Sequence, residues 1–363
     1  MMAVGKLKTN DLKAVRLYNM GLTTRANSLL DAISTTVGIQ AQQPNAAIMN
    51  AVIRASSDKH EFNQLAETES IVRTWGQRWT LQLFSHEDYN LVIGARKNEA
   101  IPKAYFLNQE KLVEEVAEKM VTSGIKHWDS NLMEAKFPML KGTRNLKYVI
   151  LQSLTRLGQG FYDASTTNTK WRYQIIEPNL LDVSSSLKKL ILRYLKGFGP
   201  ASIEDFTKWS GIKISTTRPI WQRVTSELFK YQGNGSDEIL VNTYALTDNK
   251  LAQLTELMLA KPIIAARFDA TMTGYGDKSW LFSEQQQQVM WSKNGILYAP
   301  IIDQGQLIGT WNNTIKGTKM AVEVKTWADR SAVLEQKLAA SFVELSKQML
   351  CELSGVKFET QAL

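Results

Sequence analysis

The chain has very little of the chemistry that proteins use to bind metals or to form disulfides. Among its 363 residues are one cysteine and three histidines. Cys351 has no partner for a disulfide, and so few thiol and imidazole groups argue against a metal site built by the protein. No stretch holds the roughly 18 apolar residues of a membrane span, and the first residues lack a signal-peptide core. We therefore expect a cytoplasmic protein that spans no membrane and uses no metal or cofactor.

What the chain does have is an ordinary hydrophobic content and an excess of positive charge. Hydrophobic residues make up 44% of the sequence, which is typical of a folded soluble protein. Lysine and arginine number 43 against 35 acidic residues, giving a net charge of +8 and a pI near 9.3. This balance is compatible with a polyanionic partner such as nucleic acid. The length permits two or three domains of roughly 100–200 residues each.

The same order of expected elements occurs three times before residue 247. In residues 1–105, 106–180 and 181–247, helical segments are followed by a β-rich hairpin. Three helices and a two-stranded wing make up the winged helix, a variant of the helix-turn-helix. From element order alone, a generic α+β protein remains the alternative.

The pattern changes in residues 248–363. After a short helix, residues 262–327 alternate strand-like segments with the turn sequences GYGDKS, SKNG and DQGQ. Residues 330–353 then have the 3.6-residue apolar spacing of a long amphipathic helix. The predicted fold is therefore α+β, with three tandem winged-helix units, a C-terminal β-rich segment and a closing helix.

Basic side chains are concentrated in the helix and wing expected for the second unit. Residues 141–173 contain six lysines and arginines but one acid, Asp163. Such side chains could neutralise DNA phosphates, and a neighbouring tryptophan could stack on bases. The residues predicted to bind DNA in this segment are Lys147, Arg156, Lys170, Trp171 and Arg172. The alternative is a solvated helix face with an aromatic core residue.

A cluster of glutamines lies in the stretch VGIQAQQP, residues 37–44. In a helix, Gln40 and Gln42 would point about 200° apart and could not share a target. They can converge if the preceding helix ends near Gly38 and the next residues are extended, which Pro44 favours. On spacing alone, a solvated cap or loop is the alternative interpretation.

Several segments in order along the chain resemble the winged-helix DNA-binding family that includes the AlkZ-type DNA glycosylases. These segments are VGIQAQQP, IVRTWGQRWTLQLF (71–84), YLKGFGPASIEDFTKWSGI (194–212), RFDATMTGYGDK and GILYAPIIDQGQLIGTW. The resemblance implies three tandem winged helices wrapped into a C-shaped body that binds DNA. It also implies hydrolysis of the N-glycosidic bond of N7-alkylated or crosslinked purines, without a metal or covalent intermediate.

The family's catalytic motif, Gln-Φ-Gln or Gln-Φ-Asp, maps onto Gln40-Ala41-Gln42. The resemblance therefore implies that Gln40 and Gln42 are catalytic, and we also expect Arg78, in the segment 71–84, to bind DNA. One departure is that Gln82 replaces the histidine usual in that segment, and another is that Trp79 replaces a glycine. The implied partner is damaged double-stranded DNA, bound by a monomer.

Two functions without catalysis remain open. The first is a winged-helix DNA-binding protein or transcription regulator, although three DNA-binding units in one chain differ from the dimeric symmetry of an operator repressor. The second is a nonspecific architectural DNA binder, for which binding would depend steeply on salt and would ignore damage.

Overall fold

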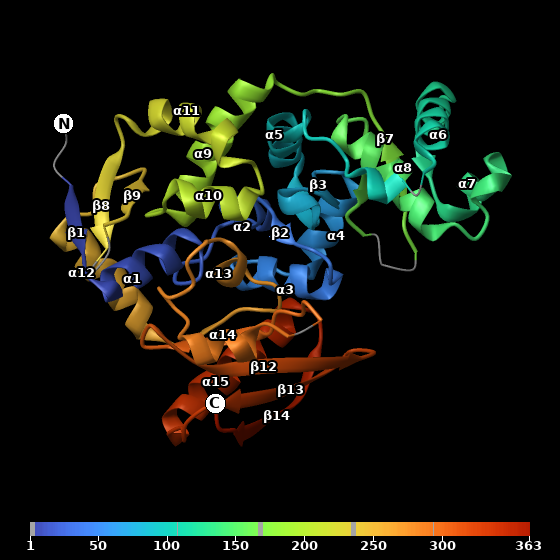
Figure 1. The fold of residues 1–363 in the computed structure, drawn as a ribbon. Helices are drawn as coiled ribbons and strands as arrows, with labels where there is room; N and C mark the ends of the chain where they lie inside the picture. The colour runs from blue at the N-terminus through green and yellow to red at the C-terminus, as the bar shows by residue number, and fades with distance from the viewer. Residues whose placement is uncertain (1–3, 107, 166–169, 234–236, 293) are drawn as a thin grey trace. The chain divides into compact units, whose positions relative to one another are not determined.

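The structure is a computed structural model that describes residues 4–106, 108–165, 170–233, 237–292 and 294–363 (Figure 1). The chain divides into two compact units. Unit 1 comprises Met1–Phe62 and Ile191–Leu363, and unit 2 comprises Asn63–Leu190. Helices α4 (Lys59–Glu67) and α9 (Val183–Phe198) contain the two boundaries. Helices and sheets occur in both units, which confirms the predicted α+β class.

Unit 2 combines one sheet with a group of helices. Its strands are β3 (Ile71–Trp75), β4 (Leu81–Ser85), β5 (His127–Trp128), β6 (Gly160–Asp163) and β7 (Tyr173–Ile175). They are hydrogen-bonded in the order β4-β3-β6-β7-β5, and all these neighbours are antiparallel. Its other elements are α5 (His86–Arg96), α6 (Glu110–Thr122), α7 (Ser130–Lys136), α8 (Arg144–Arg156) and the 3-10 turns η1 (Gln77–Trp79), η2 (Lys103–Phe106) and η3 (Pro138–Leu140).

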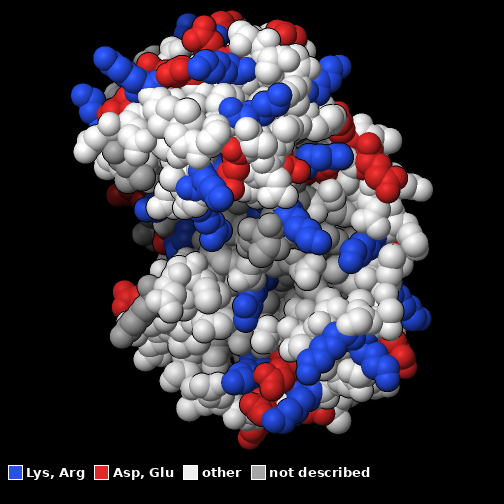
Figure 2. Space-filling model, turned by 90° about the vertical axis from the view of Figure 1, so that its right-hand side faces the viewer, with Lys and Arg blue, Asp and Glu red and all other residues white. Residues whose placement is uncertain are grey.

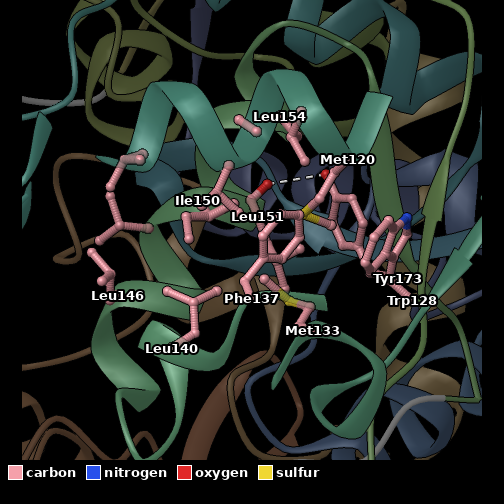
Figure 3. Packing of buried hydrophobic residues seen from close by; sticks show 14 of the residues in the cluster. Met120, Trp128, Met133, Phe137, Leu140, Leu146, Ile150, Leu151, Leu154 and Tyr173 are labelled. Carbon is pink, nitrogen blue, oxygen red and sulfur yellow. Dashed lines mark hydrogen bonds between the residues drawn. The ribbon is translucent and has the colours of Figure 1, made fainter. Parts of the chain in front are cut away.

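Helix α8 is the centre of the hydrophobic core of unit 2. Leu146, Ile150, Leu151 and Leu154 are at most 2% exposed. Their side chains point toward apolar residues of α6, α7 and the sheet (Figure 3). The Tyr173 hydroxyl in this core donates to the Leu151 carbonyl at 3.0 Å. Because apolar residues pack against the inner side of α8, several polar residues of this helix are buried as well.

Unit 1 contains the first helices of the chain and further helices between α9 and the C-terminal sheet. They are α1 (Thr9–Asn19), α2 (Leu29–Thr35), α3 (Pro44–Ile53), α10 (Ile203–Ser210), α11 (Ile214–Thr225) and α12 (Asp248–Ala260). Strand β1 (Gly5–Leu7) pairs parallel to β8 (Phe229–Gly233), which pairs antiparallel to β9 (Ile239–Asn242). Helix α10 begins at a capping box of Ser202 and Asp205 and ends at Gly211, whose φ is 77°.

The C-terminal part of unit 1 is a sheet with strand order β10-β11-β12-β13-β14 (Figure 1). Its elements are β10 (Ile263–Ile264), α13 (Ala270–Thr273), α14 (Glu284–Met290), β11 (Ala299–Asp303), β12 (Gln306–Lys316), β13 (Lys319–Thr326), α15 (Ala332–Gln348) and β14 (Glu352–Thr360). The β-rich segment is therefore present, and α15 is the predicted closing helix.

The end of the chain corrects one prediction. Helix α15 ends at Gln348 rather than at residue 353, because Leu350 takes a left-handed conformation with φ of 58°. The following residues form β14, an edge strand that the sequence pattern did not indicate, paired parallel to β13. The register shifts between Met320 and Ala321, beside Gly355, so the alternation of apolar residues in β14 is broken.

Candidate functional site

The QAQ segment lies between two helices in an extended conformation. Helix α2 ends at Thr35, and Val37 and Gly38 then take positive φ values of 51° and 95°. The two-residue strand β2 (Ile39–Gln40) follows. Gln43 is extended, with φ of −115° and ψ of 103°, because Pro44 occupies the first turn of α3. The helix break that convergence of the amides requires is therefore present.

The two glutamine side chains meet. In an extended segment, residues i and i+2 point to the same face, and Gln40 Nε2 donates a hydrogen bond to Gln42 Oε1 at 2.9 Å. Ala41, which points to the other face, is 1% exposed. Ala41 thus anchors the segment in the interior while the amides form a pair.

The second amide oxygen of this pair is available as an acceptor. Gln40 Oε1 is buried and accepts no hydrogen bond from any described residue. A buried carbonyl oxygen without a donor is unfavourable by about 1–3 kcal/mol, so such atoms mark places where a water or ligand binds. The pair can therefore accept a hydrogen bond from a water molecule at Gln40.

The β3–β4 hairpin of unit 2 contains the two departures from the family pattern. Gln82 is 5% exposed, and its Nε2 donates to Thr80 Oγ1 at 2.8 Å. Trp79 has a φ of 54° and Arg78 a φ of 53°, a region that costs a non-glycine residue roughly 1–2 kcal/mol. Gln82 is thus bound within its own hairpin, and Trp79 occupies a backbone conformation that suits glycine.

Contacts on both the indole ring and its nitrogen hold Trp79 in place. The Arg156 Cζ lies 3.6 Å from the centre of the ring, and the Arg96 Cζ lies 4.3 Å from it. Trp79 Nε1 donates to Glu99 Oε2 at 2.8 Å, and Arg156 Nη1 donates to the Glu99 carbonyl at 2.8 Å. Burial, together with the positive charge of Arg96, lowers the pKa of Arg156 to about 10.

Arg78, at the same hairpin tip, is partly exposed. Burial and then the charge of Arg96 lower the pKa of its guanidinium. Arg78 and Arg156, two of the predicted DNA contacts, are thus both neighbours of Arg96. Of the two, only Arg78 is accessible enough to meet DNA in this conformation.

Lys147 is buried within unit 2. Its exposed fraction is 8%, and its Nζ donates to Ser130 Oγ at 2.8 Å and forms an ion pair with Glu134. The hydrogen bond that Lys147 Nζ donates to Glu134 lowers the pKa of Glu134 below its ordinary value. The predicted phosphate contacts therefore do not fit the burial of Lys147 or of Arg156, which is 4% exposed.

The predicted wing contacts are accessible. Lys170 and Arg172 are exposed, and Arg172 Nη2 forms an ion pair with Asp163 at 2.7 Å. Trp171 is half-buried, and its ring lies 5.8 Å from that of Tyr162. The Thr166–Thr169 part of the hairpin tip lies outside the described residues. The structure thus brings these three residues together at the end of one hairpin.

Helix α11 carries basic residues that the prediction did not single out. Thr217, Trp221 and Thr225 are buried at four-residue spacing, so one face packs inward. Arg218 and Arg223 are exposed. The spacing of the buried residues could have revealed this basic face. Figure 2 shows one side of the protein, on which Lys and Arg side chains lie among both acidic and uncharged ones.

No group of three or more His, Cys, Asp or Glu side chains among the described residues could hold a metal ion. Within the same ranges, no helix is long and apolar enough to cross a membrane.

Comparison with known proteins identifies the family. Residues 152–347 match the family described as "DNA glycosylase AlkZ-like", and this range is more than half of the 363-residue chain. The chain belongs to the AlkZ-like DNA glycosylase family. The predicted resemblance and the general function of a DNA glycosylase in repair are thereby confirmed, and DNA is the implied partner. No curated protein matches the sequence.

A solved structure has the same fold. The chain is similar to the Streptomyces sahachiroi DNA glycosylase AlkZ, with a TM-score of 0.77 and 16% sequence identity. The similarity covers 98% of this chain and 100% of that chain. At this identity the similarity establishes the fold. The AlkZ-like family match begins at Gln152, so Gln40 and Gln42 lie outside the matched range.

Proposed function

We propose that this AlkZ-like protein hydrolyses the N-glycosidic bond of N7-alkylated purines in duplex DNA, including bulky or crosslinked adducts. Gln40 and Gln42 form its catalytic pair, and the protein acts as a monomer. The observation that carries the proposal is the 2.9 Å hydrogen bond between the two amides, beside the unpartnered Oε1 of Gln40.

The chemistry of the substrate explains why amides suffice. Glycosidases commonly need one carboxyl group to protonate the leaving group and a second to activate water or attack the sugar. An N7-alkylpurine is already cationic, so it leaves as a neutral base and needs no general acid. The enzyme must then position a water at the anomeric carbon and tolerate a positively charged sugar in the transition state.

The glutamine pair fits both requirements. Gln40 Oε1 accepts a hydrogen bond from the attacking water and so positions it, and Gln42 fixes the orientation of the Gln40 amide through their hydrogen bond. Positioning of a reactant can supply several kcal/mol of the barrier. The partial negative charge of an amide oxygen also favours the cationic sugar. An undamaged purine is a poor leaving group, so this site discriminates by chemistry as well as by fit.

The predicted DNA-binding architecture is part of the proposal. The orders α6-β5-α7-α8-β6-β7 and α9-α10-α11-β8-β9 support winged helices in the segments 106–180 and 181–247. We assign a third winged helix to 1–105 and the β-rich segment with its closing helix to 248–363. Arg78, Lys170, Trp171 and Arg172 are the proposed contacts to the DNA backbone and bases, because they are at least partly exposed.

A DNA-binding protein without catalysis is the second candidate. It is favoured by Gln82, which replaces the family histidine and donates its hydrogen bond to Thr80 instead of offering a titratable group. Under our proposal the reaction needs no imidazole, since the leaving base requires no proton.

A single-turnover assay decides between these candidates. The substrate is a duplex with one N7-methylguanine, and alkaline cleavage reports the abasic product. We expect the wild type to release the base, and Gln40→Ala to lower the rate by about 100-fold or more through misplacement of the water. Gln42→Ala should have a similar effect, because it frees the Gln40 amide to rotate.

Gln43→Ala is the matched control. Gln43 is the neighbouring amide, and its side chain makes no capping hydrogen bond to α3, so the rate should stay near that of the wild type. Wild-type excision that persists unchanged in Gln40→Ala and Gln42→Ala would refute the catalytic pair. Tight binding without release of this base or of a crosslinked one would favour the second candidate.

A further inference from the structure

A strained turn joins α2 to the QAQ segment. Gly38 N donates to the Ile33 carbonyl, and Val37 N donates to the Ser34 carbonyl, each at 3.1 Å. These two bonds form a Schellman motif, in which the residue after the helix cap takes a positive φ and is usually glycine. Val37 occupies that position with a φ of 51°, although its side chain is β-branched. Strain of this kind persists only where surrounding residues hold the backbone.

Helix α9 supplies a polar contact that holds this turn. The C-terminal half of α9, residues 191–198, belongs to unit 1, as α2 does. Arg193 Nη2 donates to the Ser34 carbonyl at 3.0 Å. The last turn of α2 contains no basic residue of its own. Arg193 therefore provides the positive charge that stabilises the C-terminal end of a helix.

Gly197 brings the backbone of α9 against the same turn. Arg193 and Gly197 are four residues apart, so they lie on one face of the helix. A Cβ atom at Gly197 would lie 2.1 Å from the Thr35 carbonyl oxygen, and any larger residue would displace the end of α2. Tyr194 and Phe198 are at most 1% exposed and anchor α9 in the core. The turn is therefore held by a helix that is itself fixed.

Thr36 links the turn to the strand that follows it. Its side chain is 1% exposed, and Oγ1 donates to the Gly38 carbonyl at 3.0 Å. That carbonyl belongs to the peptide group that leads into Ile39, the first residue of β2. The hydroxyl thus fixes the direction in which the extended chain leaves the turn. Because Gln40 is the second residue of β2, this direction determines where its amide points.

We propose that Arg193, Gly197 and Thr36 are positioning residues for the Gln40–Gln42 pair. We call these three residues the turn clamp. In this role they hold the backbone from which Gln40 Oε1 meets the attacking water. The inference rests on the proposed function, since the orientation of the amides affects the reaction rate only if the pair is catalytic. It adds that α9, in the segment 181–247, controls the geometry of a site in the segment 1–105.

Single-turnover excision of N7-methylguanine at saturating enzyme tests Arg193, because it separates the chemical step from DNA affinity. Arg193→Met keeps the apolar part of the side chain and removes its bond to the turn, and we expect the rate constant to fall about tenfold. Arg193→Lys, which can still donate to the carbonyl, should recover most of this loss. Lys196→Met is the matched control, since it removes the same charge from an exposed position of the same helix. Equal rate constants for Arg193→Met and Lys196→Met would overturn the inference.

The other two residues of the turn clamp have their own matched variants. Thr36→Val keeps the shape of the side chain and should also lower the rate constant about tenfold, whereas Thr36→Ser keeps the hydroxyl and should excise at nearly the wild-type rate. For Gly197→Ala the control is Gly309→Ala, because a Cβ atom at Gly309 would lie 2.1 Å from the Lys325 carbonyl oxygen. Both alanine variants should unfold at a lower temperature, but only Gly197→Ala should slow excision in the folded protein.

A double-mutant cycle with Gln40→Ala distinguishes positioning from a general loss of structure. If Arg193 acts through Gln40, Arg193→Met should have no further effect on the rate constant once Gln40 is alanine. The same holds for Thr36→Val. A tenfold loss in both backgrounds would show that these residues do not act through Gln40 and would refute the turn clamp.

Amide hydrogen exchange of the full chain tests the turn clamp without an excision assay. Peptides that cover residues 36–43 should exchange faster in Arg193→Met and Thr36→Val than in the wild type and Lys196→Met, because the turn opens more often. Unchanged exchange would refute the turn clamp even in a protein that excises the base. Faster exchange in a protein that excises no damaged purine would support the hold on the QAQ segment and refute only the proposed reaction.

Discussion

Helices α8 and α11 have the same place in their segments, since each is the last helix before a hairpin. They differ in the burial of their basic residues. Helix α8 buries Lys147 and Arg156 at 8% and 4% exposure. Helix α11 buries only Thr217, Trp221 and Thr225 and leaves Arg218 and Arg223 exposed. Basic residues in two helices that each precede a hairpin are thus buried in one case and exposed at the surface in the other.

The difference arises from the partners that each helix meets. In α8 the buried cations are accommodated by Glu134, the Glu99 carbonyl and the face of Trp79. Long basic side chains can be buried when their charged ends are satisfied in this way. On α11, Arg218 and Arg223 are exposed, so their charge is available at the surface. Basic residues of the two helices should therefore respond differently to mutation.

The largest expected effect is that of Arg156→Met. Removal of the guanidinium eliminates its stacking on Trp79 and its hydrogen bond to Glu99. Unit 2 should lose about 2–4 kcal/mol of unfolding free energy, measured by urea denaturation. Arg223→Met on α11 is the control and should change the value by less than about 0.5 kcal/mol. Equal effects of the two substitutions would contradict the comparison.

Lys147→Met should have the next largest effect. The substitution removes the hydrogen bond to Ser130 and the ion pair with Glu134, and it should lower the unfolding free energy by about 1–3 kcal/mol. Adding Glu134→Gln completes a double-mutant cycle that isolates the pair. DNA affinity of the folded variant should equal that of the wild type. A marked loss of DNA affinity without loss of stability would indicate that Lys147 contacts DNA.

The double variant Arg218→Ala/Arg223→Ala should show the reverse behaviour. Stability should be unchanged, while the slope of log affinity against log salt should decrease by about 2 if each arginine neutralises one phosphate. Anisotropy titrations over a range of salt concentrations measure this slope. An unchanged slope would mean that the exposed face of α11 does not meet DNA.

The smallest effect concerns the pH dependence of the Lys147–Glu134 pair. Hydrogen bonding to Lys147 lowers the pKa of Glu134 in the folded state, so the pair stabilises the fold above the ordinary glutamate pKa of about 4.3. The contribution is lost as the pH falls through the lowered value. Denaturation curves of the wild type and Lys147→Met should therefore converge in acid. A difference that grows on acidification would contradict this assignment.

The sequence was a good guide where local backbone chemistry decides the structure. Gly38 and Pro44 predicted a break between helices, and the structure has an extended Ile39–Gln40 strand between α2 and α3. The same reasoning allowed the two amides to converge, which the 2.9 Å hydrogen bond shows. Their catalytic role remains a prediction until it is measured.

The sequence was a poor guide where distant segments decide the structure. The burial of Lys147 and Arg156 depends on Glu134 and Trp79, which no local pattern connects to α8. Strand β14 was missed because its stability comes from pairing with β13, while Gly355 and a register shift disrupt its own alternation. Charge counts and periodicity describe a segment by itself, so they do not reveal the partners it finds in the fold.

The choice of amides at Gln40 and Gln42 affects how well the site resists alkylating agents. Agents that alkylate purines also attack thiolates and other strong nucleophiles, and a thiolate is the most reactive of these in proteins. A carboxamide is neither ionised nor nucleophilic at neutral pH. In the function proposed here, the protein can work in the presence of the chemicals that create its substrate without being inactivated at its own catalytic groups.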